Sequence, residues 1–307
     1  MLADQQIAAL IILPVALIGV ICNWTVALFI RTLPSLKNSF GRLTASQSFG
    51  DALHSTLFLF YFVPMCFFDS EWMKANSIHC GQLLLIAYDI STYSHFCISL
   101  NRFCSIVSPI KYDQIFNEKN TNLMVAVSWA LAIFPSFYLY VYQDCRFYYF
   151  DGFWVFLFSM TPVCMTITWY ADFLKYNSIV ISIVIIDIIT VSKVRHFKDK
   201  MLASSSQSHV KRRNSEMNFL KQACLQAFVF VCELITYFVI TPKVGDSERW
   251  TRFFLSTFAW VCVHTCDGII TLMFNKEFTK LVCRKIYHEN SSQVHRETSV
   301  TNTTRKF

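Results

Sequence analysis

The sequence predicts an all-α membrane protein, a bundle of seven transmembrane helices. Hydrophobic residues make up 54% of the 307 residues and charged residues only 15%, whereas a soluble domain carries about 25% charged residues. A soluble chain of this size cannot bury so much apolar surface, so part of it must face lipid. Seven stretches are long and apolar enough to cross about 30 Å of hydrocarbon. None alternates with the period of a strand, so each is expected to be a helix.

The predicted helices are taken in chain order, followed by the connections between them. They cover residues 7–30, 43–68, 81–107, 123–142, 164–194, 219–240 and 253–274. In the connection after the fourth helix, Asp151-Gly152 separates an aromatic run from a run with a β-branched residue, which predicts a β-hairpin in the second outer loop. Residues 276–287 are expected to form a short amphipathic helix on the cytoplasmic surface.

Two polar segments are expected to be unstructured. Residues 199–214 are Ser-rich and basic, and residues 288–307 are rich in Ser and Thr with almost no apolar side chains. The seven-transmembrane domain is therefore expected to cover residues 1–287, followed by a disordered tail of residues 288–307. Cys283, within the surface helix, is a candidate for palmitoylation.

The distribution of positive charge predicts the orientation. Most of the 27 Lys and Arg residues fall in the connections that face the cytoplasm if the N-terminus is outside. The net charge of +7 is thus explained by a bias along the membrane, and a nucleic-acid partner is disfavoured. No P-loop, HExxH or Gly-x-Ser-x-Gly motif appears, so we expect neither an enzyme nor a cofactor.

Motifs at the ends of two helices resemble those of rhodopsin-like G-protein-coupled receptors. Residues 101–112, which contain Asn101-Arg102-Phe103, Pro109 and Tyr112, are similar to the family's acidic-Arg-Tyr pattern and the Pro and Tyr that follow it. Residues 267–271 are similar to Asn-Pro-x-x-Tyr, with Gly268 and Thr271 in place of Pro and Tyr. The markers of the first, second and fourth helices match residues 19–23, Asp51 and Trp129.

The closer resemblance is to nematode chemosensory serpentine receptors of class X. It is carried by residues 36–41, 100–104, 169–173 and 219–224. This resemblance implies a receptor for an odorant or pheromone-type cue, small molecule or peptide, in the plasma membrane of sensory-neuron cilia. It also implies a heterotrimeric G protein as partner and, by analogy of fold, arrestin and membrane lipids.

The resemblance assigns G-protein coupling and activation to Asn101, Arg102, Phe103, Pro109 and Tyr112. In the family, the Arg restrains the inactive state beside an acidic neighbour. Asn101 offers a hydrogen bond but no opposite charge. We therefore expect the inactive state to be held less by this pair than by packing.

A polar core is expected where Asn23, Asp51 and Asp267 face one another. Two carboxylates close together in a membrane interior disfavour each other's ionisation. The site is therefore expected to contain either a proton, on one of the two carboxyls or shared between them, or a bound sodium ion, and no other metal.

The candidate ligand pocket lies in the outer half of the bundle. Its residues are aromatic and polar, as small-molecule sites require: Tyr88, Asp89, Thr92, Trp154, Glu233, Tyr237, Trp260 and His264. Asp172 and Lys175 are one turn apart and are expected either to line this pocket or to pair with each other. The residue that binds amines in aminergic receptors corresponds to Leu84 or Ala87, neither of them acidic, which disfavours a biogenic amine.

The family has a disulfide between the start of the third helix and the second outer loop. The resemblance therefore implies Cys80–Cys145; a Cys80–Cys164 bond, or no bond, remains open. Two other functions also remain open. One is a neuropeptide receptor of the same fold, and the other is a transporter or ion channel, since charges within helices also mark ion paths.

Overall fold

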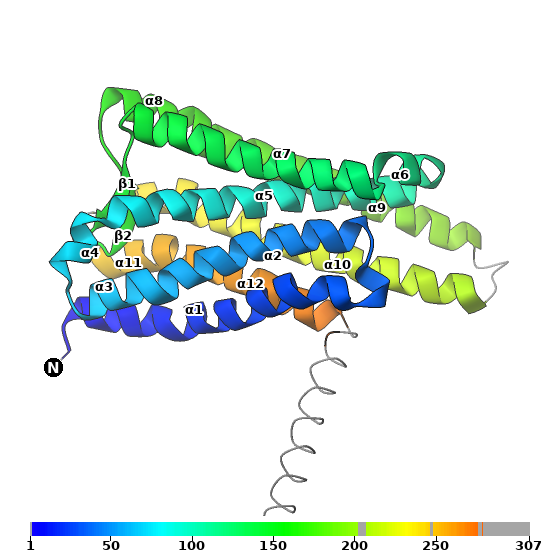
Figure 1. Cartoon of the computed structure of the whole chain (residues 1–307), viewed down its shortest axis with the longest axis horizontal. Coiled ribbons are helices and arrows are strands. Elements are labelled where there is room, and N and C mark those ends of the chain that lie inside the picture. Colours follow the sequence, from blue (N-terminus) through cyan, green and yellow to red (C-terminus); the bar gives the residue numbers. More distant parts are fainter. Residues whose placement is uncertain (1, 202–206, 246–247, 276–277, 279–307) are drawn as a thin grey trace, which may run out of the picture.

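The computed structural model describes residues 2–201, 207–245, 248–275 and 278, and only the backbone of residues 196–201 and 207–216. Seven long helical segments run side by side (Figure 1). They are α1 (Asp4–Phe29) with η1 (Ile30–Thr32); α2 (Ser39–Leu57), η3 (Phe58–Phe62) and α3 (Val63–Phe67); α5 (Ser77–Val107); α7 (Glu118–Ser136) and η4 (Phe137–Tyr142); α8 (Pro162–Thr168), η5 (Trp169–Leu174) and α9 (Lys175–Met201); α10 (Gln207–Ile235) and η6 (Thr236–Ile240); and α11 (Arg249–Phe253), η8 (Phe254–Phe258) and α12 (Ala259–Phe274).

Short elements join these segments. They are η2 (Pro34–Leu36), α4 (Glu71–Ala75), α6 (Pro109–Ile115), the strands β1 (Phe147–Phe150) and β2 (Val155–Phe158), and η7 (Thr241–Lys243). The strands mark one end of the bundle, here called the hairpin end, and α6 lies at the other, here called the Arg102 end (Figure 1).

The predicted seven-helix bundle is confirmed. Within the described residues, six of the long segments are apolar enough to cross a membrane by length and composition. The remaining one, α2 to α3, is more polar because Gln47, Asp51 and His54 lie on it, and all three are buried. It packs against α1, α5 and α12, so these polar side chains face protein and not lipid.

The described parts of the segment 199–214, residues 199–201 and 207–214, are helical and not unstructured as predicted. The helix α9 continues to Met201, and α10 already begins at Gln207. Extending a formed helix adds a hydrogen bond for each residue ordered, so both helices run on beyond their apolar stretches. The predicted surface helix 276–287 with Cys283, and the predicted tail 288–307, lie outside the described residues apart from Phe278.

The predicted β-hairpin is present, with a turn different from the one its sequence suggests. The antiparallel strands pair Phe147 with Phe158 and Phe150 with Val155, which leaves residues 151–154 as a four-residue turn. The residue with a left-handed backbone is Trp154 (φ 53°), not Gly152. The Trp154 ring is fully buried against Trp250, and this packing outweighs the preference of a bulky residue for negative φ.

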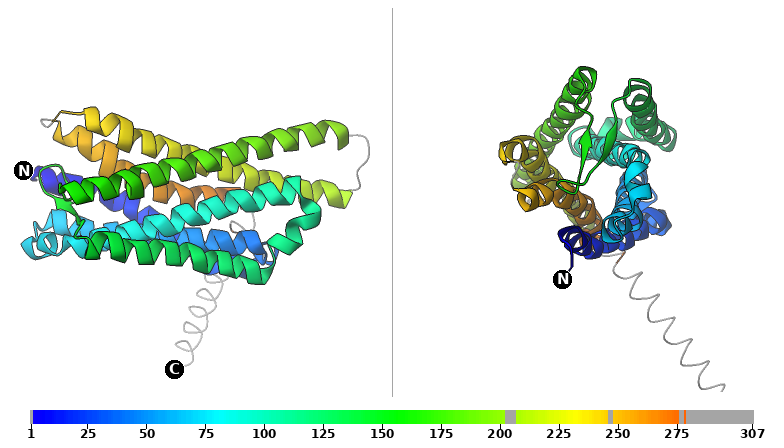
Figure 2. Two further views of the ribbon diagram at one scale, coloured as in Figure 1. Left: turned by 90° about the horizontal axis from the view of Figure 1, so that it is seen from above. Right: turned by 90° about the vertical axis from the view of Figure 1, so that its left-hand side faces the viewer.

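The hairpin lies across the mouth of the ring of helices (Figure 2). It approaches α5 closely at Gly81, where a Cβ atom would come within 2.1 Å of the Phe147 carbonyl oxygen. A glycine at this position therefore allows the backbone of β1 to contact the helix.

The disulfide implied by resemblance, Cys80–Cys145, is wrong in its partner. Cys145 is bonded to Cys164, with the two Cα atoms 4.8 Å apart, and Cys80 is a free, buried thiol. The hairpin explains this pairing, because its two strands run in opposite directions and bring the start and end of the loop together. Cys80 instead packs in the hydrophobic cluster that contains Leu84 and Phe147.

Candidate ligand pocket and coupling site

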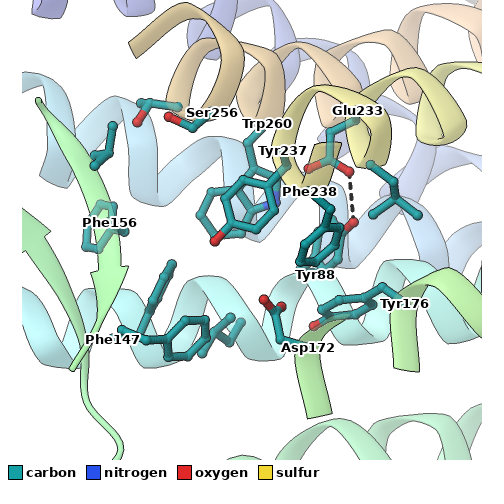
Figure 3. Close-up of a pocket in the computed structure, with 15 residues that line it drawn as sticks. Tyr88, Phe147, Phe156, Asp172, Tyr176, Glu233, Tyr237, Phe238, Ser256 and Trp260 are labelled. Carbon is teal, nitrogen blue, oxygen red and sulfur yellow. Dashed lines mark hydrogen bonds between the residues drawn. The ribbon is translucent and has the colours of Figure 1, made fainter. Parts of the chain in front are cut away.

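A pocket lies beneath the hairpin and contains about 480 Å³ of empty space, including the part open to solvent. Ligand sites for small molecules are commonly concave, with mostly apolar walls and a few polar groups. Eight of its fifteen lining residues are aromatic, and they come from the hairpin and from four of the long segments (Figure 3). The lining consists of Leu85, Tyr88, Phe147, Val155, Phe156, Phe158, Asp172, Tyr176, Glu233, Leu234, Tyr237, Phe238, Ser256, Thr257 and Trp260.

Two carboxyl groups reach this pocket, and they differ in their partners. Glu233 accepts a hydrogen bond from the Tyr88 hydroxyl at 3.1 Å. Asp172 is 8% exposed, and its carboxylate points into the space between Phe147 and Tyr88 (Figure 3). No hydrogen bond joins the Asp172 carboxylate to any residue that the structure describes.

Lys175 does not pair with Asp172, although the two are one turn apart. Its Nζ lies 2.7 Å from Asp89 Oδ1, which also accepts from the Tyr176 hydroxyl at 2.9 Å. The π-helical turn η5 ends at Leu174, between Asp172 and Lys175. It changes the angle between their side chains from that of an α-helix, so Lys175 reaches across to α5.

The predicted pocket residues fall into two groups. Tyr88, Glu233, Tyr237 and Trp260 line the pocket. The other four lie outside the lining: Asp89 beside Lys175, Thr92 donating to the Tyr88 carbonyl, Trp154 in the hairpin turn, and His264 in the polar core. The sequence reasoning missed Phe147, Phe156 and Phe158, although the high density of aromatic residues in the two strands was a usable signal.

Below the pocket, the polar core is centred on Asp51. Its Oδ1 lies 2.7 Å from His264 Nδ1 and accepts from the Ser91 hydroxyl at 2.6 Å. Asp267 Oδ2 accepts from Gln47 at 3.1 Å. All of these side chains are buried.

Asn23 joins the polar core from α1. Its amide donates to the His264 carbonyl at 2.8 Å, and a Cβ at Gly268 would lie 2.5 Å from its Oδ1. The glycine that replaces the family's proline therefore leaves space for Asn23 against α12. Sequence reasoning missed Gln47 and His54, although with Asp51 their spacing of four and three residues places them on one helix face.

One continuous series of contacts joins the pocket to the polar core. The Trp260 ring lies 4.5 Å from the His54 ring, which lies 3.8 Å from the His264 ring. His264 in turn contacts Asp51. From the polar core, Gln226 on α10 continues the series by donating to the Asp267 carbonyl at 3.3 Å, and Gln226 and Gln222 both donate to Thr271 on α12.

Toward the Arg102 end of the bundle, the side chain of Arg102 packs between two rings, Phe219 of α10 and Phe40 of α2. The guanidinium carbon is 3.5 Å from the Phe40 ring centre and 4.7 Å from that of Phe219, within the range of cation–π attraction. Arg102 is 3% exposed. Its side chain thus bridges three long segments of the bundle through α2, α5 and α10.

The other predicted coupling residues surround this contact. Asn101 is buried and donates to the Tyr112 hydroxyl at 3.1 Å. Pro109 is exposed at the first turn of α6, and Phe103 is half-buried. The structure therefore brings Asn101 and Tyr112 together, while Pro109 starts the short helix that carries Tyr112.

Ionic contacts also connect α4 with the hairpin at the other end. Lys74 bonds Asp69, Glu71 at 3.2 Å and Asp151 at 3.0 Å. The hydrogen bond from Lys74 lowers the pKa of Asp69. Partial burial opposes the charge of Lys74, but its three carboxylate partners outweigh burial and raise its pKa.

The architecture is that of a G-protein-coupled receptor. The structure of squid rhodopsin superimposes with a TM-score of 0.77 at 15% identity, covering 92% of this chain and 82% of rhodopsin. The melatonin receptor type 1C of Gallus gallus is 30% identical over 143 residues, which are 45% of this chain and 40% of that receptor. Receptors of this class are not enzymes, and the chain is a multi-pass membrane protein.

The chain belongs to the family described as "Serpentine type 7TM GPCR chemoreceptor Srx", whose sequence model matches residues 13–275. Serpentine receptor class X 45 of Caenorhabditis elegans is 36% identical over 293 residues, covering 91% of this chain and 81% of the relative. Serpentine receptor class X-43 of the same organism is 24% identical over 285 residues, covering 92% and 88%. The family assignment made from residues 36–41, 100–104, 169–173 and 219–224 is thereby confirmed.

Proposed function

We propose that the protein is a chemosensory receptor that binds an extracellular cue beneath the hairpin and activates a heterotrimeric G protein at the Arg102 end. The observation that carries this proposal is the contact series from Trp260 through His54 to His264 and Asp51, which Gln226 extends to α10 by donating to the Asp267 carbonyl one turn along α12. A cue that displaces Trp260 would disturb buried groups that also contact α10, and Phe219 of α10 packs against Arg102. Packed interiors shift between discrete arrangements, so a small change at the pocket can be transmitted.

The proposed orientation places the hairpin outside the cell. Arg31, Lys37 and Lys111 lie in the connections at the Arg102 end, and Arg42 and Lys119 lie in the first turns of α2 and α7 beside them, as the cytoplasmic side requires. The family description as a chemoreceptor supports the plasma membrane of sensory-neuron cilia as the location. Arrestin, acting on the Ser/Thr-rich tail, and membrane lipids are proposed as further partners.

Within the polar core we propose that Asp51 and Asp267 share one proton. Two oxygens, Asp51 Oδ2 and Asp267 Oδ1, are buried without a hydrogen-bond partner. A proton on either carboxyl removes the repulsion between two charges. The alternative occupant is a sodium ion, for which Asn23 Oδ1 and Gln47 Oε1 are also buried and unpartnered.

The test is ligand-stimulated nucleotide exchange by purified G proteins with the receptor in lipid nanodiscs, screened against volatile odorants and against neuropeptides. Arg102→Ala is expected to abolish stimulated exchange while ligand binding persists. The matched control is Arg31→Ala, an exposed residue at the same end, which is expected to retain exchange. Ligand-dependent currents in cells that lack G proteins would instead establish a channel, and a response confined to peptides would establish a neuropeptide receptor.

A further inference from the structure

We infer that the pocket takes a small organic cation, with its ammonium group between Asp172 and Glu233 and its apolar body against the aromatic walls. The inference rests on the proposed function, because it assumes that this pocket is the ligand site. It adds the chemical class of the ligand, which neither the family nor the fold specifies.

The charge balance of this part of the bundle is the first support. Three buried acids lie at this level, namely Asp89, Asp172 and Glu233. Lys175 is committed to Asp89 by a contact of 2.7 Å. None of the fifteen lining residues, all in the described part of the chain, is Lys, Arg or His, so the two acids that face the pocket have no cation there.

Asp172 is the second support, because it is an acceptor without a donor. Its side chain is more than nine-tenths buried and points into the pocket (Figure 3). Buried carboxylates are normally paired or hydrogen-bonded, since an unpaired charge loses its hydration without compensation. Lys175, in direct contact with Asp89, acts on Asp172 only at longer range, so a ligand ammonium would supply the direct contact that the protein does not.

The aromatic walls are the third support. Tyr88 lies 5.8 Å from Trp260, ring centre to ring centre, and Phe147 lies 6.0 Å from Trp260. The faces of such rings attract organic ammonium groups, and aromatic cages are the usual solution for quaternary ones. The same rings would cover the apolar part of the ligand. A hydrated metal ion has no apolar part and would make no use of these walls.

The acids of this pocket do not lie at the position that carries the acid in aminergic receptors. The residues aligned with the aminergic acid on α5 are Leu84 and Ala87, which carry no charge. Here the acids come from η5 and α10, which belong to other long segments than α5. The chemistry of an amine site is thus present with a different set of residues.

The experiment compares a permanent cation with its neutral carbon isostere. The purified receptor in nanodiscs is titrated with benzyltrimethylammonium and with neopentylbenzene, together with choline, phenethylammonium and the anion phenylacetate, and binding is read from the melting temperature. We expect benzyltrimethylammonium to bind at least roughly tenfold more tightly than neopentylbenzene, because only the cation interacts with the carboxylates. Equal binding of the two isosteres, or binding by none of the three cations, overturns the inference.

Two variants locate the effect. Asp172→Asn is expected to weaken binding of benzyltrimethylammonium at least roughly tenfold and to leave neopentylbenzene unaffected. Asp187→Asn is the matched control, since Asp187 is a buried carboxylate of α9 that contacts Ser99 outside the pocket. Unchanged cation binding in Asp172→Asn, or an equal loss in Asp187→Asn, contradicts the assignment.

Failure of this inference can be told from failure of the proposed function. Nucleotide exchange stimulated only by a neutral or anionic probe refutes the cation and retains the receptor. Cation binding that depends on Asp172 but stimulates no G protein supports the cation and refutes the proposed signalling.

Discussion

The hairpin end and the Arg102 end of the bundle are built differently. All the π-helical turns in the described chain, η3, η4, η5, η6 and η8, lie toward the hairpin end. Toward the Arg102 end the long segments are free of them, and α5 alone runs for 31 residues without a break. Such turns are rare elsewhere and frequent at functional sites.

This difference indicates how the two ends divide the work of a receptor. At the hairpin end, irregular helices and a covalently closed loop shape a cavity around two acids. At the Arg102 end, regular helices are held together by the contact of Arg102 with two rings. The shape of the pocket should therefore depend on the loop at the hairpin end. The balance between the inactive and active states should depend on Arg102 at the other end.

The largest expected effect is loss of the disulfide at the hairpin end. Cys145→Ala removes a closure of 19 residues, and we expect the free energy of unfolding to fall by about 3 kcal/mol and ligand affinity to fall with it. Thermal melting of the purified receptor measures the first and ligand titration the second. Cys80→Ala is the control, and its free energy of unfolding should fall by only about 1 kcal/mol. A larger fall would indicate that Cys80 takes part in the disulfide.

The next effect is at Arg102. Phe219→Leu removes one ring from the guanidinium while keeping most of the apolar volume. Because a desolvated cation–π contact contributes about 1–2 kcal/mol, we expect basal nucleotide exchange to rise roughly tenfold. Phe228→Leu, on the exposed face of the same helix, should leave basal exchange unchanged. Equal exchange in both variants would show that packing on Arg102 does not restrain the inactive state.

A smaller change in the opposite direction is expected at Asn101. Asn101→Asp places an acid beside Arg102. The Asn101 amide donates to the Tyr112 hydroxyl, whereas the Asp carboxylate would accept from that hydroxyl. We expect basal exchange to fall about threefold, as for an added ion pair of roughly 0.5–1 kcal/mol. Asn122→Asp adds the same charge beside Arg42 and serves as control, since Asn122 bonds Arg42 at 3.1 Å. Unchanged basal exchange in Asn101→Asp would refute the idea that the missing acid weakens the restraint.

The ion pairs between α4 and the hairpin should produce a smaller, pH-dependent effect. The pKa of Asp69 is lowered by Lys74, so its contribution to stability is present above the ordinary Asp pKa and is lost as pH falls through the lowered value. The difference in melting temperature between wild type and Asp69→Asn should therefore shrink on acidification. Asn tolerates the left-handed backbone of this position (φ 52°) and is a fair replacement. A difference that stays constant with pH would contradict this role of Asp69.

The smallest expected effect concerns the polar core. If Asp51 and Asp267 share a proton, the melting temperature should be the same in NaCl and in KCl at equal ionic strength. A bound sodium ion would instead raise it with sodium concentration, because a ligand of the native state stabilises that state. A sodium-specific increase in melting temperature that disappears in Asp51→Asn would show that the site holds a sodium ion and not a shared proton.

Local sequence patterns were sufficient for the bundle but not for several contacts between its segments. The apolar runs predicted every long segment, and the Asp-Gly signal predicted the hairpin. The Cys145–Cys164 bond depends on where the strands bring the loop ends, which spacing alone does not reveal. Likewise, Lys175 reaches Asp89 because η5 reorients the helix, and no residue pattern announced that turn.

The π-helical turns have a consequence for aligning this chain with other receptors. Each accommodates about one residue more than an α-helical turn, which corresponds to about 100° of rotation. Positions counted along the fifth, sixth or seventh segment from landmarks near Arg102 therefore fall out of phase within the turns that contain Asp172, Tyr237 and Ser256. Comparisons of ligand selectivity between receptors should therefore superimpose coordinates on the hairpin side of each π-helical turn. Numbering carried through a turn would place a residue on the wrong face of its helix.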